Sequence, residues 1–186
     1  MTSKARLIEL LATHSAQRGD FTLTSGRKSD LYIDARLTTM SPEGLTTIGT
    51  LGFEELQRSG WRVTAVGGLT LGADPVSYAI SYASAGSKSP LRAFTVRKQP
   101  KAHGTQKLIE GPLRPGDRVA VIEDVITTGG SALQAIQALQ SFGAIVTGIL
   151  ALIDREEGGR AALEQAGFSV IALTTASQIA ALMNKQ

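Results

Sequence analysis

The chain has 186 residues, of which 42% are hydrophobic and 19% charged, and this suits one soluble α/β domain spanning residues 1–186. Its net charge of +3 suits an anionic substrate, but with only 5% aromatic residues the chain lacks the profile of a nucleic-acid-binding protein. The absence of cysteine excludes disulfides, thiolate metal ligands and thiol nucleophiles.

The amino-terminal segment MTSKARLIELLATHS predicts an amphipathic helix, because Glu9 interrupts the apolar run that a signal peptide needs. The longest apolar-looking run, residues 144–153, is too short to span a bilayer. We therefore expect a cytoplasmic protein that binds neither membranes nor nucleic acid.

The next segment, FTLTSGRKSDLYIDAR, predicts a β-hairpin. Apolar residues alternate with polar ones on both sides of Ser25–Gly26, which is typical of two strands joined by a turn. We expect this hairpin to form a small hood, made mainly of residues 1–40 with a possible carboxyl-terminal contribution.

Helix and strand patterns alternate through the middle of the chain, which predicts a mostly parallel sheet with helices on both faces. Ser41–Pro42–Glu43 opens a helix that Gly60 ends. A strand at Val63–Val66 then runs into Gly67–Gly72, a glycine turn that either binds an anion or only permits a tight bend. Further helices are expected at 74–83, 161–166 and 177–183, and strands at 91–96, 144–153 and 170–173.

The most informative stretch is RVAVIEDVITTGGSALQAIQALQSF, residues 118–142. The apolar run 119–122 predicts a buried strand, and Glu123 and Asp124 follow where that strand is expected to end. The loop TTGGS, residues 127–131, then opens a helix with apolar residues at helical spacing. The unit is therefore a strand, an acid pair, a loop of phosphate size and a helix.

Each part of this unit has a chemical interpretation. Glycines and free amides at a helix start can hold a phosphate, and adjacent carboxylates can accept the vicinal hydroxyls of a ribose or bind a divalent cation. The alternative is a solvated strand end and an ordinary loop with Ser131 as a helix cap. The order of the parts favours a ribose 5-phosphate site, and no lysine precedes Ser131 as a nucleotide-triphosphate loop would require.

A basic segment, RKQPKAHGTQKLIEG, spans residues 97–111 and has no helical pattern, so it predicts a long loop. Such loops are either solvated or act as lids over a site.

VIEDVITTGGS resembles the signature of the type I phosphoribosyltransferases, which bind 5-phosphoribosyl 1-diphosphate. RKQPKAHG, with FTLTSGRKS, LYIDAR and DREEGG, extends the resemblance over nearly the whole chain to the orotate phosphoribosyltransferases. The resemblance implies the type I phosphoribosyltransferase fold, a central mostly parallel sheet flanked by helices, with a small amino-terminal hood. It implies transfer of the phosphoribosyl group to orotate, giving orotidine 5′-monophosphate and diphosphate, in pyrimidine biosynthesis.

The resemblance also implies roles for individual residues. Those expected to bind the donor are Arg97, Lys98, Lys101, His103, Glu123, Asp124, Val125, Ile126, Thr127, Thr128, Gly129, Gly130 and Ser131. Those expected to contact orotate are Tyr32, Ile33, Thr127 and Arg155. Lys101 and His103 would assist departure of diphosphate, and Asp124 would stabilise positive charge on the ribose.

Two further implications concern partners. Mg²⁺ is expected to be held mainly through the substrate diphosphate and ribose, with no dedicated protein site. A homodimer is expected in which lid residues reach the neighbouring subunit's site.

The chain departs from the family pattern at two positions. Thr24 and the Thr70–Leu71 turn stand where many members have a lysine, so Arg27 or Lys28 is a candidate replacement. The alternative functions are a phosphoribosyltransferase for another base, a regulator that senses the donor without turnover, and a flavodoxin-like signalling module. Arg155 and the basic lid favour orotate, because its carboxylate needs a cation.

Overall fold

The computed structural model describes residues 3–22, 28–99 and 107–184. The described helices are α1 (Ser3–Leu10), the π-helical η1 (Leu11–Ser15), α2 (Arg36–Thr39), α3 (Pro42–Arg58), α4 (Ala73–Ser84), α5 (Gly130–Phe142), α6 (Gly159–Gln165) and α7 (Ala176–Met183). The described strands are β1 (Ala16–Thr22), β2 (Lys28–Ile33), β3 (Ala65–Leu69), β4 (Arg92–Val96), β5 (Ile109–Glu110), β6 (Arg118–Ile126), β7 (Ile145–Asp154) and β8 (Val170–Thr175).

A six-stranded sheet in the order β5-β4-β3-β6-β7-β8 forms the centre of the molecule. All of its neighbouring strands pair in parallel except β4 and β5, which are antiparallel. Because β4, β3, β6 and β7 are parallel, their carboxyl ends lie along one edge of the sheet. β3 and β6 are neighbours in the middle of this edge. The predicted mostly parallel sheet is confirmed.

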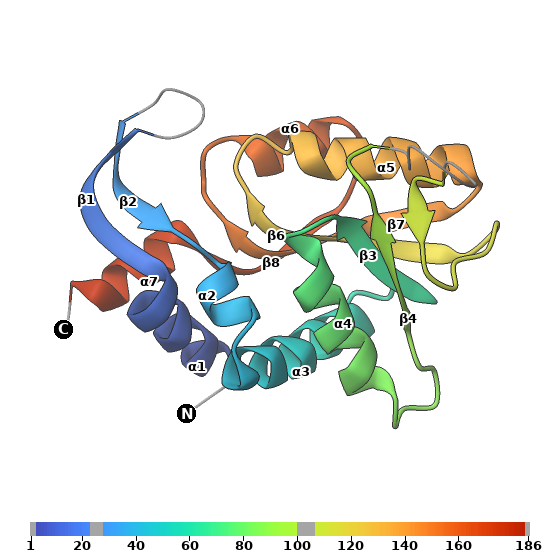
Figure 1. The fold of residues 1–186 in the computed structure, drawn as a ribbon, viewed down its shortest axis with the longest axis horizontal. Helices are drawn as coiled ribbons and strands as arrows, with labels where there is room; N and C mark the ends of the chain where they lie inside the picture. Colours follow the sequence, from blue (N-terminus) through green and yellow to red (C-terminus); the bar gives the residue numbers. More distant parts are fainter. Residues whose placement is uncertain (1–2, 23–27, 100–106, 185–186) are drawn as a thin grey trace.

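Helices cover both faces of this sheet (Figure 1). One apolar cluster joins α1, α3, α4 and α7 to the sheet, and it contains Leu7, Ile48 and Ile122. A second cluster packs α5 and α6 on the opposite face around Leu139 and Leu163. No described helix has the length and apolar content needed to cross a bilayer.

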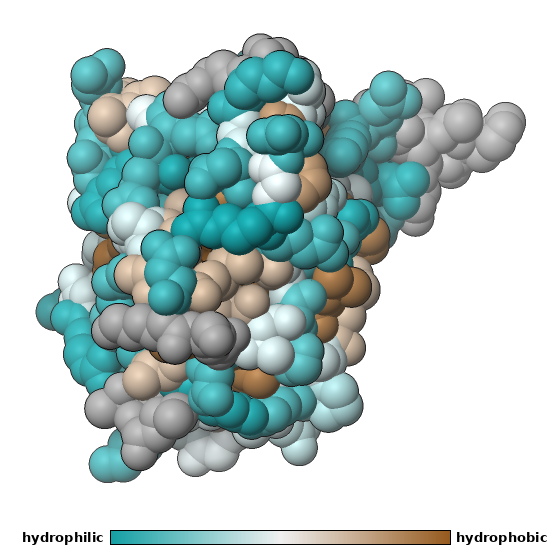
Figure 2. Space-filling model, turned by 90° about the vertical axis from the view of Figure 1, so that its left-hand side faces the viewer, coloured by the Kyte–Doolittle hydropathy of each residue, from teal (hydrophilic) through white to brown (hydrophobic). Residues whose placement is uncertain are grey.

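The amino-terminal hairpin forms a separate antiparallel sheet in which Ala16 pairs with Ile33. Its residues are mostly exposed, and Figure 2, which views the molecule from this side, shows a largely hydrophilic surface with apolar residues between. The carboxyl-terminal segment contributes here, because the Arg18 Nη2 donates to Asn184 Oδ1 at 2.9 Å. The hood expected from the sequence is present, and the turn at Ser25–Gly26 lies outside the described residues.

Two strands extend further than predicted. The acid pair Glu123 and Asp124 lies within β6, because pairing with β7 continues to Ile126 opposite Asp154. Likewise β3 runs to Leu69, so Gly67 and Gly68 are strand residues and not part of a turn.

The two strand glycines are explained by packing. A Cβ on Gly67 would lie 2.2 Å from the Phe94 carbonyl oxygen, and one on Gly68 would lie 2.0 Å from the Ile122 carbonyl oxygen. Neighbouring backbones therefore approach β3 more closely than a side chain allows.

The basic segment 97–111, which was predicted to be a loop, contains a short strand near its carboxyl end. Ile109 and Glu110 form the short strand β5, which pairs with Val96 and Thr95 of β4. The return to the sheet was missed because a two-residue strand has too few residues to show a periodic pattern.

Trp61 lies just before β3, on the side of the sheet where the parallel strands begin, and its indole covers Gly148 of β7. A Cβ on Gly148 would lie 2.4 Å from Trp61 Cζ2, so this glycine provides the surface on which the ring packs. The Trp61 carbonyl accepts from Arg118 Nη2 at 3.2 Å, which connects this ring to the start of β6.

Gly68→Ala should destabilise the fold, because the added methyl group meets backbone that cannot move without shifting β6. We expect a loss of about 1–3 kcal/mol and a lower midpoint of thermal unfolding. Gly86→Ala is the matched control, since no atom lies within 4 Å of the added Cβ. Equal midpoints for the two variants would contradict the packing explanation.

Candidate active site

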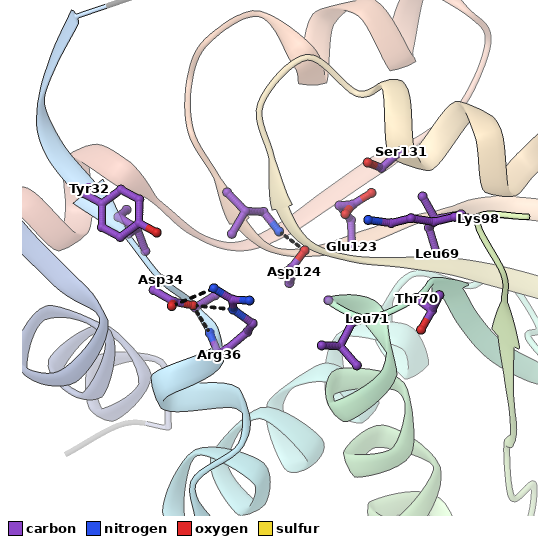
Figure 3. Close-up of a pocket in the computed structure, with 14 residues that line it drawn as sticks. Tyr32, Asp34, Arg36, Leu69, Thr70, Leu71, Lys98, Glu123, Asp124 and Ser131 are labelled. Atoms are coloured by element: carbon purple, nitrogen blue, oxygen red, sulfur yellow. Dashed lines mark hydrogen bonds and ion pairs between the residues drawn. The ribbon is translucent and has the colours of Figure 1, made fainter. Parts of the chain in front are cut away.

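A cavity of about 330 Å³ lies at the carboxyl edge of the sheet. It is lined by residues 32–36 of the hood, the turn 69–72 after β3, Lys98 after β4, residues 123–125 of β6 and Ser131 of α5. Figure 3 shows these side chains converging from different elements. Segments that are distant in the sequence are therefore brought together where parallel sheets bind ligands.

The floor of the cavity carries two adjacent carboxylates, Glu123 and Asp124. Glu123 is only 7% exposed. Burial, followed by the charge and hydrogen bonding of Asp124, raises the pKa of Glu123 to about 8. A group that hydrogen-bonds or neutralises this pair would favour ionisation of Glu123.

The turn after β3 lies directly against Asp124. A Cβ on Gly72 would lie 2.4 Å from both the Asp124 Cγ and Oδ2, so only glycine permits this approach. Asp124 Oδ1 also accepts from the Val125 amide at 2.9 Å, which fixes the carboxylate above the strand end. The peptide bond between Thr70 and Leu71 is cis.

The loop at residues 127–131 turns sharply into α5. Gly129 has φ +83° and a Cβ there would lie 3.0 Å from Leu163, while one on Gly159 would lie 2.3 Å from the Thr127 carbonyl oxygen. The loop is therefore packed tightly against the start of α6. Its amides lie at a helix amino terminus, where they can bind an anion.

The structure places two residues of this motif differently, one at the cavity and one in the core. Ser131 lies in the first turn of α5 and lines the cavity, while the capping position is Gly129, so the alternative of Ser131 as a helix cap is wrong. The side chain of Ile126 is 1% exposed and belongs to the apolar core, which leaves only its backbone for a ligand.

The basic lid is described only at its two ends. Lys98 lines the cavity, and Figure 3 shows its side chain directed toward the acid pair. Arg97 is not among the lining residues, and its Nη1 lies 3.9 Å from Glu110 Oε1. Lys101 and His103 lie outside the described residues, so their roles stay predictions.

The hood supplies the predicted Tyr32 and Ile33 and two lining residues that the sequence analysis missed, Asp34 and Arg36. Arg36 donates from Nε to Asp34 Oδ1 at 2.8 Å and from Nη2 to Asp34 Oδ2 at 2.9 Å. This pairing raises the pKa of Arg36 and lowers that of Asp34. Asp34 lies two residues after Tyr32, and alternate residues of an extended chain share a face, but Arg36 begins α2 and left no such signal.

Arg155 follows β7 at the same sheet edge but is not among the cavity-lining residues. Its side chain is almost buried, its Nη2 lies 2.9 Å from Glu157 Oε1 and it donates to the Leu31 carbonyl oxygen at 3.3 Å. Arg155 thus joins the base of the hood to the main sheet, and its contact with orotate stays a prediction.

Within the described ranges, no group of three or more histidine, cysteine or acidic side chains could hold a metal ion. The two carboxylates on β6 are the cavity's oxygen donors at the sheet edge. This donor set fits Mg²⁺ only when a substrate and water complete the shell, as hard cations commonly require.

Solved structures share this fold. Mycobacterium tuberculosis orotate phosphoribosyltransferase in complex with Fe(III) dicitrate matches with a TM-score of 0.84 and 42% identity, covering 96% of this chain and 99% of that chain. The same enzyme in complex with 5-phospho-α-D-ribosyl 1-diphosphate matches with a TM-score of 0.80 and 37% identity, covering 96% of this chain and 99% of that chain. Adenine phosphoribosyltransferase from Leishmania donovani, at 17% identity and a TM-score of 0.66, shares the fold alone. Fold and site together define a type I phosphoribosyltransferase.

Relatives in sequence specify the branch, although no protein-family model matches the chain. An orotate phosphoribosyltransferase from Rhodopirellula baltica is 45% identical over 175 residues, 92% of this chain and 91% of the relative. One from Aquifex aeolicus is 45% identical and covers 94% of each. The chain belongs to the orotate phosphoribosyltransferase family.

Glu123→Gln should change how stability depends on pH. The folded pKa of about 8 lies above the ordinary value of 4.5, so between these values the folded protein binds more protons and becomes less stable as pH rises. Glutamine cannot ionise, so the variant should gain on the order of 1–3 kcal/mol relative to the wild type between pH 5 and pH 9.

Denaturant unfolding at pH 5, 7 and 9 measures this difference. Asp124→Asn is the companion variant, which retains Glu123. Because it removes the neighbouring charge, its free energy of unfolding should depend less on pH than that of the wild type. A stability difference between Glu123→Gln and wild type that stays constant over this range would contradict the raised pKa.

Proposed function

We propose that this chain transfers the 5-phosphoribosyl group from 5-phosphoribosyl 1-diphosphate to orotate, forming orotidine 5′-monophosphate and diphosphate in pyrimidine biosynthesis. The observation that carries this proposal is a single cavity lined by the acid pair, Lys98 and Ser131, the last residue of the loop 127–131. Family membership supports orotate as the acceptor, and the M. tuberculosis relative was solved with the same donor.

Each wall of the cavity suits a different end of the donor. The amides of residues 127–131 would hold the 5-phosphate, and Glu123 and Asp124 would accept from the ribose hydroxyls. The diphosphate would then lie toward the turn 70–72 and Lys98. The donor's C1′–O bond breaks and its electron pair leaves with the diphosphate, while Asp124 stabilises positive charge on the ribose. A bond from C1′ to the orotate ring nitrogen forms, and the proton of that nitrogen passes to the departing diphosphate or to water.

Lys101 and His103 would assist the leaving group. A diphosphate carries several negative charges, and cations on the lid would stabilise the charge that develops as the C1′–O bond breaks. The lid would also exclude water, which competes for the ribosyl centre. Both residues lie outside the described ranges, so this role rests on the sequence and on their proximity in the chain to Lys98.

Mg²⁺ would bind mainly through the substrate. Glu123 and Asp124 supply carboxylate oxygens beside the expected ribose, and the donor's diphosphate supplies the rest of a coordination shell. The ion neutralises charge on the diphosphate when bound.

Orotate would be held on the hood side by Tyr32 and Ile33, with Thr127 and Arg155 as its polar contacts. The guanidinium of Arg155 is occupied by Glu157 and the Leu31 carbonyl in this structure. Nε and Nη2 make these contacts, so the orotate carboxylate would bind through Nη1 or displace one of these partners. The protein would act in the cytoplasm, where its substrates are small soluble anions.

A homodimer is supported by an apolar groove of about 450 Å³ between α3 and α4, which includes Leu45, Tyr78 and Tyr82. Tyr82 is 86% exposed, and Leu71, which also lines the cavity, is 56% exposed. Exposed apolar surface of this kind marks association sites. The proposed occupant of this surface is a second copy of the chain.

The direct test is turnover. The protein is incubated with Mg²⁺, 5-phosphoribosyl 1-diphosphate and either orotate or adenine, and the loss of orotate is followed by ultraviolet absorbance. We expect consumption of orotate only. No consumption of orotate would refute the proposed function, and consumption of adenine would favour the alternative of another base.

Lys101→Ala should lower kcat by roughly 10²-fold if the lysine stabilises charge mainly in the transition state. Steady-state kinetics with both substrates measure this effect. Lys88→Ala, in the loop between α4 and β4, removes the same charge outside the cavity and should leave kcat unchanged. Full activity in Lys101→Ala would remove the lid from the mechanism.

Mixing two inactive variants tests whether sites are shared. If each site combines Asp124 of one subunit with Lys101 of the other, a heterodimer of Asp124→Asn and Lys101→Ala contains one intact site. After random subunit exchange, about one quarter of the wild-type activity should return. Heterodimers that form but stay inactive would show that each subunit uses its own lid.

A further inference from the structure

Asp74 is a buried carboxylate to which the proposed mechanism gives no role. It lies in the first turn of α4, is 8% exposed and accepts two hydrogen bonds from side chains. Thr70 Oγ1 donates to its Oδ2 at 2.6 Å, and Thr95 Oγ1 donates to its Oδ1 at 2.8 Å. Each carboxylate oxygen therefore holds a different segment of the chain.

These two segments are adjacent walls of the cavity. Thr70 belongs to the lining turn after β3, and Thr95 lies on β4, three residues before the lining Lys98. The backbone joins the same segments, since the Thr70 amide donates to the Val96 carbonyl oxygen at 2.8 Å. Asp74 thus adds a charged link exactly where two neighbouring strands leave the sheet.

The strength of this link follows from its burial. Hydrogen bonds to a carboxylate are stronger than those between neutral groups, and a buried acceptor that loses its donor keeps its desolvation penalty. A carboxylate in the first turn of a helix is also favoured by the helix dipole. A role confined to the helix would not, however, require both oxygens to bind residues outside α4.

A fourth side chain extends the network to the surface. The Tyr78 and Thr95 hydroxyls lie 2.7 Å apart, and because Thr95 donates to Asp74, Tyr78 is the donor in this pair. Tyr78 also lines the apolar groove between α3 and α4. The hydroxyl of Thr95 is therefore held from both sides.

We propose that Asp74 is a positioning residue that sets the turn 70–72 and the base of the lid at the spacing needed to bind the donor's diphosphate. This inference rests on the proposed function, because the diphosphate is the ligand assigned to these two walls. Asp74 itself does not touch the substrate. It acts through the turn's backbone and through Lys98.

The test measures donor binding separately from turnover. Thr70→Val and Thr95→Val each remove one hydroxyl at nearly constant volume, and Thr70→Ser and Thr95→Ser keep it. We expect each valine variant to raise KM and Kd for 5-phosphoribosyl 1-diphosphate about five- to tenfold, with KM for orotate within twofold. The serine variants should restore wild-type values, and Asp74→Asn should add little to Thr70→Val.

Ser77→Ala is the control for stability. Ser77 is buried on the same helix and donates to the Ala73 carbonyl oxygen at 2.8 Å, away from the lining residues. It should lower the unfolding midpoint and leave both KM values unchanged. Valine variants that only lower the midpoint, or that raise both KM values equally, would overturn the inference.

Calorimetric titration with 5-phosphoribosyl 1-diphosphate alone separates this inference from the proposed function. A wild type that binds the donor but does not consume orotate would refute the acceptor, while the effect of Thr70→Val on Kd would still decide the role of Asp74. If the wild type consumes orotate and Thr70→Val leaves the Kd for the donor unchanged, only the inference is refuted.

Discussion

The site depends on holding two carboxylates side by side at the end of β6. The burial of Glu123 and the charge of Asp124 make simultaneous ionisation of both carboxylates unfavourable, as the raised pKa of Glu123 indicates. Neighbouring segments surround the pair closely. Gly72 lets the turn after β3 contact Asp124, and the amino terminus of α5 lies nearby. A sugar with vicinal hydroxyls and anionic groups matches this combination of acceptors and donors.

The fold was predictable because its signals are local. Buried strands, helix starts at Ser41 and helix stops at Gly143 each leave a pattern in a short window, and the structure has them close to the expected places. The errors occur where pairing with a distant strand determines the outcome. β6 continues through its acids because β7 continues beside it, and no feature of the motif itself shows this.

The residues of the site also fall into two groups, those with a local signal in the sequence and those without one. Contiguous motifs gave the acid pair and Ser131, which line the cavity, and Tyr32 was predicted from the family resemblance. The phosphate-binding role of residues 127–131 stays a prediction. Asp34, Arg36 and Asp74 were missed because their importance comes from partners or walls that folding brings together. Arg155 was placed at the correct edge, but its partners Glu157 and Leu31 could be found only from coordinates.

The packing of Trp61 on Gly148 has a practical consequence for spectroscopy. The chain has a single tryptophan, and it lies at the edge of the sheet opposite the cavity. Its emission should therefore report loss of the native sheet and be insensitive to occupancy of the cavity. Intrinsic fluorescence is a probe of unfolding in this molecule, and following ligands optically requires a tryptophan introduced elsewhere.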